Sequence, residues 1–227
     1  MIRALWRLTL FRQSRRYSKY RSLALAKLLA PIFEHLKPRI IIDVGGYQSS
    51  WLKFVGNPED VITVDIDPKA LKNSLAAHKV LADAQHLPFR KLRGSLLLAI
   101  SILEHLPRFN KCLKDMIEIG DWILIQIPNL RGLVEPHTAI PLPLIIPRSM
   151  LKAIIRREFP GLYVNFLCTK NNLIKILKQY KDISTIFIWD YVYPSRLFHG
   201  VLSMLFSYLS FLPHAHLLLI RIPRHQE

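Results

Sequence analysis

The sequence predicts an α/β fold in which a mainly parallel, doubly wound sheet of seven strands carries helices on both faces. Strand-length apolar runs alternate with helical stretches over residues 39–129, which is the order that parallel sheets require. The runs are rich in Ile, Val and Leu, as expected for strands covered on both faces. Three of the first four runs end in aspartate, at Asp43, Asp65 and Asp83. This regularity indicates a shared ligand-binding edge.

Each expected element follows from its local apolar pattern and its flanking turn residues. Five strands are expected in the core, over residues 39–44, 61–67, 80–84, 96–102 and 122–127. Helices are expected between them, over residues 50–56, 69–77 and 108–119. Beyond residue 129 the pattern loosens, and we expect helices over residues 149–157 and 171–180 and strands over residues 183–189 and 217–222.

Length and composition indicate a single domain over residues 1–227, because 51% hydrophobic residues are enough to bury one core. We divide it into a basic amphipathic N-terminal helix (residues 1–36), a ligand-binding core (39–129), a cap insertion (130–161) and a C-terminal part of strands and an apolar helix (162–227). Pro31 and Pro38 are expected to bracket a short connector into the first strand. The apolar stretch 196–212 is too short and too interrupted to span a bilayer, which needs ~20 apolar residues.

The net charge of +16 lies mainly on the two flanks of the chain. Residues 1–33 carry +8, residues 34–135 carry +1 and residues 136–227 carry +7. Such a field attracts anionic partners such as nucleic acid, acidic lipid or a phosphorylated substrate, although simple solvation explains any one cluster equally well. The N-terminal segment lacks the uninterrupted apolar run of a secretory signal and fits a helix that lies on a membrane surface or covers the core.

The two cysteines, Cys112 and Cys168, lie far apart and form no CxxC pair. This argues against a zinc site or a disulfide framework and fits a reducing compartment. We therefore expect a cytoplasmic protein, peripheral to a membrane if its flanks meet lipid, with no metal.

The first predicted strand ends in Asp43, and Gly45 and Gly46 follow. Glycines let the backbone turn sharply and approach a ligand closely. In open α/β sheets, nucleotide-like ligands bind at this end of the strands. Asp43 can anchor the turn and face a cationic group of the ligand.

The next two strand ends suit the rest of an adenosine-bearing cofactor. Asp65 stands about twenty residues further on, where an acid accepts hydrogen bonds from ribose hydroxyls in dinucleotide sites. Asp83 and the backbone amide of Ala84 can read an adenine edge, because a carboxylate accepts from an exocyclic amine and an N–H donates. Taken singly, each acid is explained by strand-end capping, but that explanation does not account for all three at these spacings.

Five segments in this order resemble the class I S-adenosylmethionine-dependent methyltransferases, and in particular their type 11-like branch. They are Ile-Asp-Val-Gly-Gly (42–46), Val-Asp-Ile-Asp-Pro (64–68), Asp-Ala-Gln-His-Leu-Pro-Phe (83–89), Leu-Glu-His-Leu-Pro (103–107) and the run from Gly120 to Asn129. The resemblance covers about residues 39–129. It implies a Rossmann-like fold and S-adenosyl-L-methionine as cofactor.

The resemblance also implies roles for individual residues. Asp43, Gly45 and Gly46 would hold the methionine portion, Asp65 with the adjoining Ile66 the ribose, and Asp83 with Ala84 the adenine, while Ser101 to Glu104 would border the methyl-transfer point. One departure stands out, because Tyr47 and Ser49 occupy positions where the family usually has further glycines. Gly46 supplies the needed flexibility in one interpretation; in the other the loop is distorted and the pocket degenerate.

The reaction that the resemblance implies is in-line attack of a substrate nucleophile on the sulfonium methyl. Because positioning contributes much of such catalysis, a dedicated base is optional. His105 and His137 are the candidates for that role, since histidine transfers protons near neutral pH. For His105 the alternative is a helix-start residue packed beside the pocket.

The segment after the fourth strand bears on the acceptor. It lacks the Asn/Asp-Pro-Pro-Tyr/Phe run of many amino-group nucleic-acid methylases and has Glu104-His105 instead. This favours an oxygen of a small molecule, glycan or lipid, and the basic flanks favour an anionic membrane surface. Two alternatives stay open: an RNA methyltransferase whose basic flanks bind phosphates, and a non-enzymatic module with a damaged cofactor loop. The sequence leaves the oligomeric state undetermined.

Overall fold

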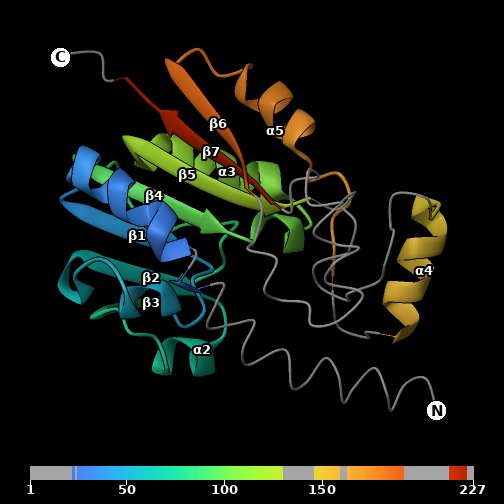
Figure 1. Cartoon of the computed structure of the whole chain (residues 1–227), viewed down its shortest axis with the longest axis horizontal. Helices are drawn as coiled ribbons and strands as arrows, with labels where there is room; N and C mark the ends of the chain where they lie inside the picture. Colours follow the sequence, from blue (N-terminus) through green and yellow to red (C-terminus); the bar gives the residue numbers. More distant parts are fainter. Residues whose placement is uncertain (1–21, 24, 130–145, 159–162, 192–214, 224–227) are drawn as a thin grey trace, which may run out of the picture.

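The structure, a computed structural model, describes residues 22–23, 25–129, 146–158, 163–191 and 215–223. Within them one seven-stranded sheet has the order β3-β2-β1-β4-β5-β7-β6, which confirms the predicted fold class (Figure 1). The strands are β1 (Ile40–Val44), β2 (Val61–Asp65), β3 (His78–Leu81), β4 (Ser95–Ile100), β5 (Trp122–Pro128), β6 (Thr185–Tyr191) and β7 (Ala215–Arg221).

The strand directions bring the functional ends together. Strands β3, β2, β1, β4 and β5 are parallel, and β7 is antiparallel to both β5 and β6. Strand β6 therefore runs in the same direction as β5. The carboxyl ends of β1, β2, β3, β4, β5 and β6, together with the amino end of β7, form one edge of the sheet.

Helices cover the two faces of the sheet (Figure 1). A helix over residues 22–36 packs Leu29 into an apolar cluster with Leu96 and Leu98 on one face. Helices α3 (Phe109–Ile119) and α5 (Lys170–Leu177) pack Leu113 and Leu173 into the cluster on the other face. The chain continues as helix through Pro31 to residue 36, so the predicted connector at Pro31 is wrong.

The remaining helices are short or stand apart from the sheet. They are α2 (Pro68–Lys72), α4 (Arg148–Glu158) and the 3-10 turns η1 (Ser50–Lys53), η2 (Pro58–Asp60) and η3 (Leu103–His105). In Figure 1, α4 stands beyond the carboxyl edge of the sheet, away from its two faces. It packs Leu151 and Ile155 against Phe166.

Three predicted elements differ from the structure for identifiable reasons. The helix predicted over residues 69–77 ends at Lys72, because the Leu75 and Ala77 N–H groups donate to the carbonyls of Gln48 and Pro58 and return the chain to the sheet. The predicted helix 50–56 is the four-residue turn η1, and Gly56 follows it with a φ of 87°. The third strand covers residues 78–81 rather than 80–84, because the chain turns out of the sheet at Asp83.

Some predictions fall on residues outside those described: His137, the first 21 residues of the basic helix, most of the cap insertion and the apolar stretch 196–212. Among the described residues, no helix is both long and apolar enough to cross a membrane. The same residues hold no cluster of three or more His, Cys, Asp or Glu side chains suited to a metal ion.

Candidate functional site

Asp43 lies at the end of β1 with only 1% of its surface exposed. Its Oδ2 accepts hydrogen bonds from the Ser49 hydroxyl at 2.7 Å and from the Trp51 indole N–H at 2.8 Å. Burial raises the pKa of Asp43 to about 6, against the lowering effect of these two donors. Asp43 therefore anchors the following loop from within, and its carboxylate does not face open space.

A chain of hydroxyl groups extends from Asp43 toward α2. The Ser49 and Thr63 oxygens are 2.7 Å apart, and those of Thr63 and Ser74 are 2.8 Å apart. Since Ser49 gives its only proton to Asp43, Thr63 must donate to Ser49 and Ser74 to Thr63. The Ala76 N–H completes the chain by donating to the Ser74 oxygen. Ser49, which stands where the family usually has a glycine, therefore orders the loop through these hydrogen bonds.

The loop keeps a glycine-like backbone although two glycines of the family pattern are absent. Tyr47 and Ser49 adopt left-handed conformations with φ of 51° and 44°, beside Gly45 at 64°. Left-handed geometry costs an L-residue roughly 1–2 kcal/mol, which the hydrogen bonds of Ser49 and of the Tyr47 N–H offset. At Gly46 a Cβ would lie 2.5 Å from the Asp43 carboxyl group, so this position requires glycine. The loop is thus ordered, with some strain.

Asp65, at the end of β2, holds its carboxylate in a fixed orientation beside the loop. Its Oδ2 accepts from the Tyr47 N–H at 3.0 Å and its Oδ1 from the Asp67 N–H at 2.9 Å. Each oxygen retains a second lone pair for a ligand hydroxyl. The next residue, Ile66, is 70% exposed, which leaves an apolar side chain beside these acceptors.

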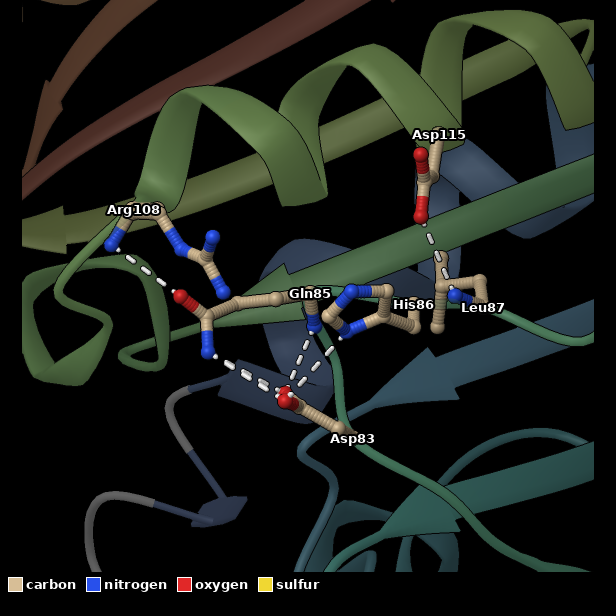
Figure 2. A network of polar contacts seen from close by, with 6 residues as sticks. All are labelled: Asp83, Gln85, His86, Leu87, Arg108 and Asp115. Carbon is tan, nitrogen blue, oxygen red and sulfur yellow. Dashed lines mark hydrogen bonds and ion pairs between the residues drawn. The ribbon is translucent and has the colours of Figure 1, made fainter.

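Asp83 begins a polar network that ties the segment after β3 to helix α3 (Figure 2). Its Oδ1 accepts from the Gln85 N–H at 2.8 Å, and this backbone donor is the main cause that lowers the pKa of Asp83. The Gln85 side-chain carbonyl accepts from the Arg108 N–H, and Asp115 accepts from the Leu87 N–H (Figure 2). The network fixes Asp83 at the site edge.

The Ala84 backbone amide completes this part of the site. Within the described part of the chain, no protein group accepts a hydrogen bond from this amide. Ala84 thus offers a donor directly beside the acceptor Asp83. This is the donor–acceptor pair that an adenine edge requires.

The segment after β4 is tied to the far half of the sheet. Ser101, with φ of 52°, donates its hydroxyl proton to the Gln126 side chain at 2.6 Å. Glu104 is fully buried, and its carbonyl accepts from the Asn165 N–H. The His105 Nδ1 lies 2.7 Å from the Tyr163 carbonyl, so that nitrogen carries the proton. The Ser101 hydroxyl is thus engaged by Gln126, and the buried Glu104 carboxylate lies 3.9 Å from the His105 Nε2.

A cavity of about 990 Å³ lies away from all of these residues. It separates the helix over residues 22–36 from the β5, β7 and β6 strands, and Phe187 and Trp189 stack on its wall with ring centroids 5.9 Å apart. None of the residues predicted for cofactor binding lines this cavity. The predicted cofactor residues Asp43, Asp65 and Asp83 lie instead at or just beyond the ends of β1, β2 and β3.

Sequence reasoning treated Trp51 as core packing and did not anticipate the roles of Ser49, Gln85 or Asn165. Trp51 is buried, as expected, yet its indole N–H also donates to Asp43. Gln85 could have been recognised by its spacing, because a residue two positions after an aspartate commonly donates its N–H to that side chain. The anchoring role of Asn165 carried no local signal, because its partners Leu106 and Pro107 are more than 50 residues away.

The described geometry fits an adenosine-bearing cofactor. Asp65 offers two oriented oxygens beside the exposed Ile66, and Asp83 and Ala84 offer an acceptor next to a donor. The close approach at Gly46 leaves the loop backbone uncovered by a side chain at that position. In open α/β sheets, ligands of this kind bind outside the carboxyl ends of the strands, which is where these groups lie.

A family model matches the central part of the chain. Residues 43–119 match the family model described as a methyltransferase domain, Methyltransf_11. Sequence comparison with curated proteins finds no match. This match covers about a third of the chain and supports the resemblance to the type 11 methyltransferases that the sequence motifs indicated.

Solved structures of low sequence identity share the fold. A possible histamine N-methyltransferase from Thermotoga maritima has a TM-score of 0.60 at 12% identity, covering 97% of this chain and 99% of its own. The plantazolicin methyltransferase BamL, in complex with a triazolic desmethyl analogue and S-adenosylhomocysteine, has 0.59 at 13% identity, with 99% and 95% covered. A methyltransferase from Archaeoglobus fulgidus has 0.54 at 16% identity, with 86% and 94% covered.

Proposed function

We propose that this enzyme transfers the methyl group of S-adenosylmethionine to an oxygen of a small-molecule, glycan or lipid acceptor at an anionic membrane surface. The cofactor supplies an electrophilic methyl group on a sulfonium sulfur. The observation that carries the proposal is the ordered row of strand ends, in which Asp65 and Asp83 keep oriented acceptors at one edge.

The residues of this chain divide the binding task between them. Asp65 would accept from the ribose hydroxyls, and Ile66 would pack on the adenosine. Asp83 and the Ala84 amide would hold the adenine edge. Asp43 would act at a distance, because its buried charge favours a cationic ligand while its oxygen holds Ser49 and Trp51.

Helix α4 and the segment before α5 support an anionic membrane surface. Helix α4 exposes Met150, at 57%, on the same helix as the exposed cations Arg148, Lys152 and Arg156. Leu167, which follows the Phe166 that packs on α4, is 61% exposed. Cations over anionic head groups with apolar residues in the interface are typical of peripheral membrane helices. The same surface would place an amphipathic acceptor beside the carboxyl edge.

The two alternatives have different supports. An RNA acceptor would use the same cations on phosphates, with an affinity that falls steeply with salt. A non-catalytic module would require a loop that no longer holds the cofactor, whereas Tyr47 and Ser49 adopt the left-handed geometry that glycines usually provide. The loop geometry therefore favours the enzyme.

Calorimetry with S-adenosylhomocysteine tests the cofactor part of the proposal. Asp65→Ala should weaken binding by about 100-fold, since charge-assisted hydrogen bonds contribute about 1.5–3 kcal/mol. Asp67→Ala is the matched control, because Asp67 caps α2 by accepting from the Lys69 N–H. That control should lose about 1 kcal/mol of stability and keep its affinity. Equal affinities for Asp65→Ala and wild type would remove Asp65 from the site.

Labelled cofactor incubated with cell extract, separated into lipid, soluble and RNA fractions, tests the acceptor. Label in the RNA fraction alone would overturn the proposal.

Cosedimentation with phosphatidylcholine vesicles, with or without phosphatidylglycerol, tests the membrane surface. A variant with Arg148, Lys152 and Arg156 changed to Gln should lose binding to the anionic vesicles. A variant with Lys175, Lys178 and Lys181 changed to Gln removes the same charge elsewhere and should retain it.

A further inference from the structure

Three charged or titratable side chains meet at the outer end of the carboxyl edge, beyond the cofactor residues. The His216 Nδ1 lies 2.7 Å from Asp190 Oδ1, and the Lys170 Nζ lies 3.0 and 3.1 Å from the two oxygens of Asp190. Each comes from a different element: His216 from β7, Asp190 from β6 and Lys170 from the first turn of α5. This cluster has no part in the cofactor site described above.

The geometry fixes the tautomer of the imidazole. A carboxylate only accepts, so the neutral His216 ring must donate from Nδ1 and keep the lone pair on Nε2. Within the described residues, no group forms a hydrogen bond with that Nε2. This arrangement, a histidine oriented by a carboxylate, is that of a general base.

The charged groups that face His216 favour the neutral ring. Desolvation is the main cause that lowers the pKa of His216, and the Asp190 hydrogen bond opposes it. The His216 and Lys170 donors lower the pKa of Asp190, so this carboxyl group is ionised. From β5, the residue paired with His216 is the apolar Ile127. Asp190 and Lys170 are therefore the charges that set its protonation among the described residues.

The register places the cluster on the acceptor side of the methyl-transfer point. His216 pairs with Ile127, and the neighbouring Gln126 holds Ser101 at the end of β4. Two inter-strand spacings of about 4.8 Å separate β7 from β4, or roughly 10 Å in all. Strand β5 lies between them and ends at Pro128, so an acceptor would have to lie over that strand end to reach both Ser101 and the imidazole.

We propose that His216 is the general base for the acceptor and that Asp190 and Lys170 are positioning residues that hold its Nε2 ready. This rests on the proposed methyltransferase function. The hydroxyl O–H bond breaks and its proton passes to Nε2. The acceptor oxygen forms the new bond to the methyl carbon, and the electron pair of the methyl–sulfur bond stays on sulfur. The imidazolium that results is stabilised by Asp190.

Nitrogen NMR of the full chain labelled with ¹⁵N-histidine tests the tautomer without an acceptor. At neutral pH, His216 should carry its proton on Nδ1 and a bare Nε2. Asp190→Asn should change the ratio of the two tautomers, because an amide can also donate to Nδ1. Carbethoxylation by diethylpyrocarbonate, read peptide by peptide, should reach Nε2 in the wild type. A proton on Nε2, or an unreactive ring, would overturn the inference.

Methyl transfer to the extract fraction that accepts label tests the catalytic role. His216→Gln keeps a donor to Asp190 and should lower the rate by about 100-fold or more, with unchanged affinity for S-adenosylhomocysteine. His78 is an exposed histidine on β3, and His78→Gln is the matched control. This control should keep both the rate of methyl transfer and the affinity for S-adenosylhomocysteine. Full activity of His216→Gln would overturn this inference but not the proposed methyltransferase function. Failure of the wild type to bind S-adenosylhomocysteine would instead overturn the proposed function.

Discussion

The two halves of the carboxyl edge are built in different ways. In the half formed by β1, β2 and β3, some partners lie close in sequence: Asp83 binds Gln85 two residues on, and Asp43 binds Ser49 six residues on. In the half formed by β5, β7 and β6, partners come from distant segments, such as His216 with Asp190, 26 residues apart, and Asn165 with Leu106, 59 apart. The cofactor half thus combines local turns with contacts that span up to 28 residues, such as Leu87 with Asp115, whereas the acceptor half depends on tertiary packing.

The largest expected effect is in the cofactor half. Gly46→Ala places a Cβ 2.5 Å from the Asp43 carboxyl group, so the loop must shift. We expect a loss of about 1–3 kcal/mol in stability and loss of S-adenosylhomocysteine binding. Urea unfolding and calorimetry measure the two effects. Gln48→Ala, in the same loop, is the control; retained binding in Gly46→Ala would show that the loop tolerates displacement.

Asp43 should give the cofactor half a distinct pH dependence. Its pKa is about 6 in the fold against 3.8 ordinarily, so the native state keeps a proton that the unfolded state releases. Its contribution to stability therefore falls as pH rises from about 4 to about 6 and is constant above, a total change of about 3 kcal/mol at ~1.36 kcal/mol per pKa unit. Urea unfolding across this range should show that Asp43→Asn removes this component. Asp60→Asn, an exposed carboxylate before β2, should leave it in place.

The acceptor half should depend on its long-range anchors. Asn165 donates from its side chain to the carbonyls of Leu106 and Pro107, and accepts from the Leu167 N–H. Asn165→Ala should cost about 1–2 kcal/mol of unfolding free energy and leave S-adenosylhomocysteine affinity unchanged. Asn171→Ala, at an exposed site on α5, is the control. A large drop in cofactor affinity would show that the two halves are coupled.

The smallest effect sharpens the account of the loop. Tyr47→Gly keeps the backbone N–H that donates to Asp65 and relieves left-handed geometry. Because glycine also gains freedom in the unfolded chain, we expect a net stabilisation of up to about 1 kcal/mol with unchanged affinity. Thermal unfolding measures the gain. Tyr47→Ala retains a Cβ and should show no gain, so equal stabilisation by both variants would exclude strain as the cause.

The difference between the halves explains what could be predicted from sequence. The strands, their order in the chain and the aspartates at their ends follow from short apolar runs and adjacent turn residues. The positions of Asp65 and Asp83 were therefore accessible, although their contacts with a ligand remain predictions. The extent of α2 was overestimated, because the donors that end it, at Leu75 and Ala77, bond to carbonyls elsewhere in the chain.

The contacts of the acceptor half were harder to predict from the sequence, because the partners lie far apart along the chain. Nothing in the neighbourhood of Asp190 or His216 along the chain marks them as partners, since their pairing depends on the antiparallel register of β6 and β7. His105 was identified from a local motif, but its contact with Tyr163 spans 58 residues. The burial of Asp43 was also missed, because a strand-end acid gives no sign of whether its carboxylate points inward.

The fluorescence of Trp51 can report on the loop that follows β1. Its N–H donates to the carboxylate that titrates near pH 6, whereas Trp122 and Trp189 line the cavity beneath the helix over residues 22–36. In a chain whose other tryptophans are changed to Phe, emission should shift with that titration. Trp51 emission could then be used to follow the binding of a cationic ligand at this loop without an added label.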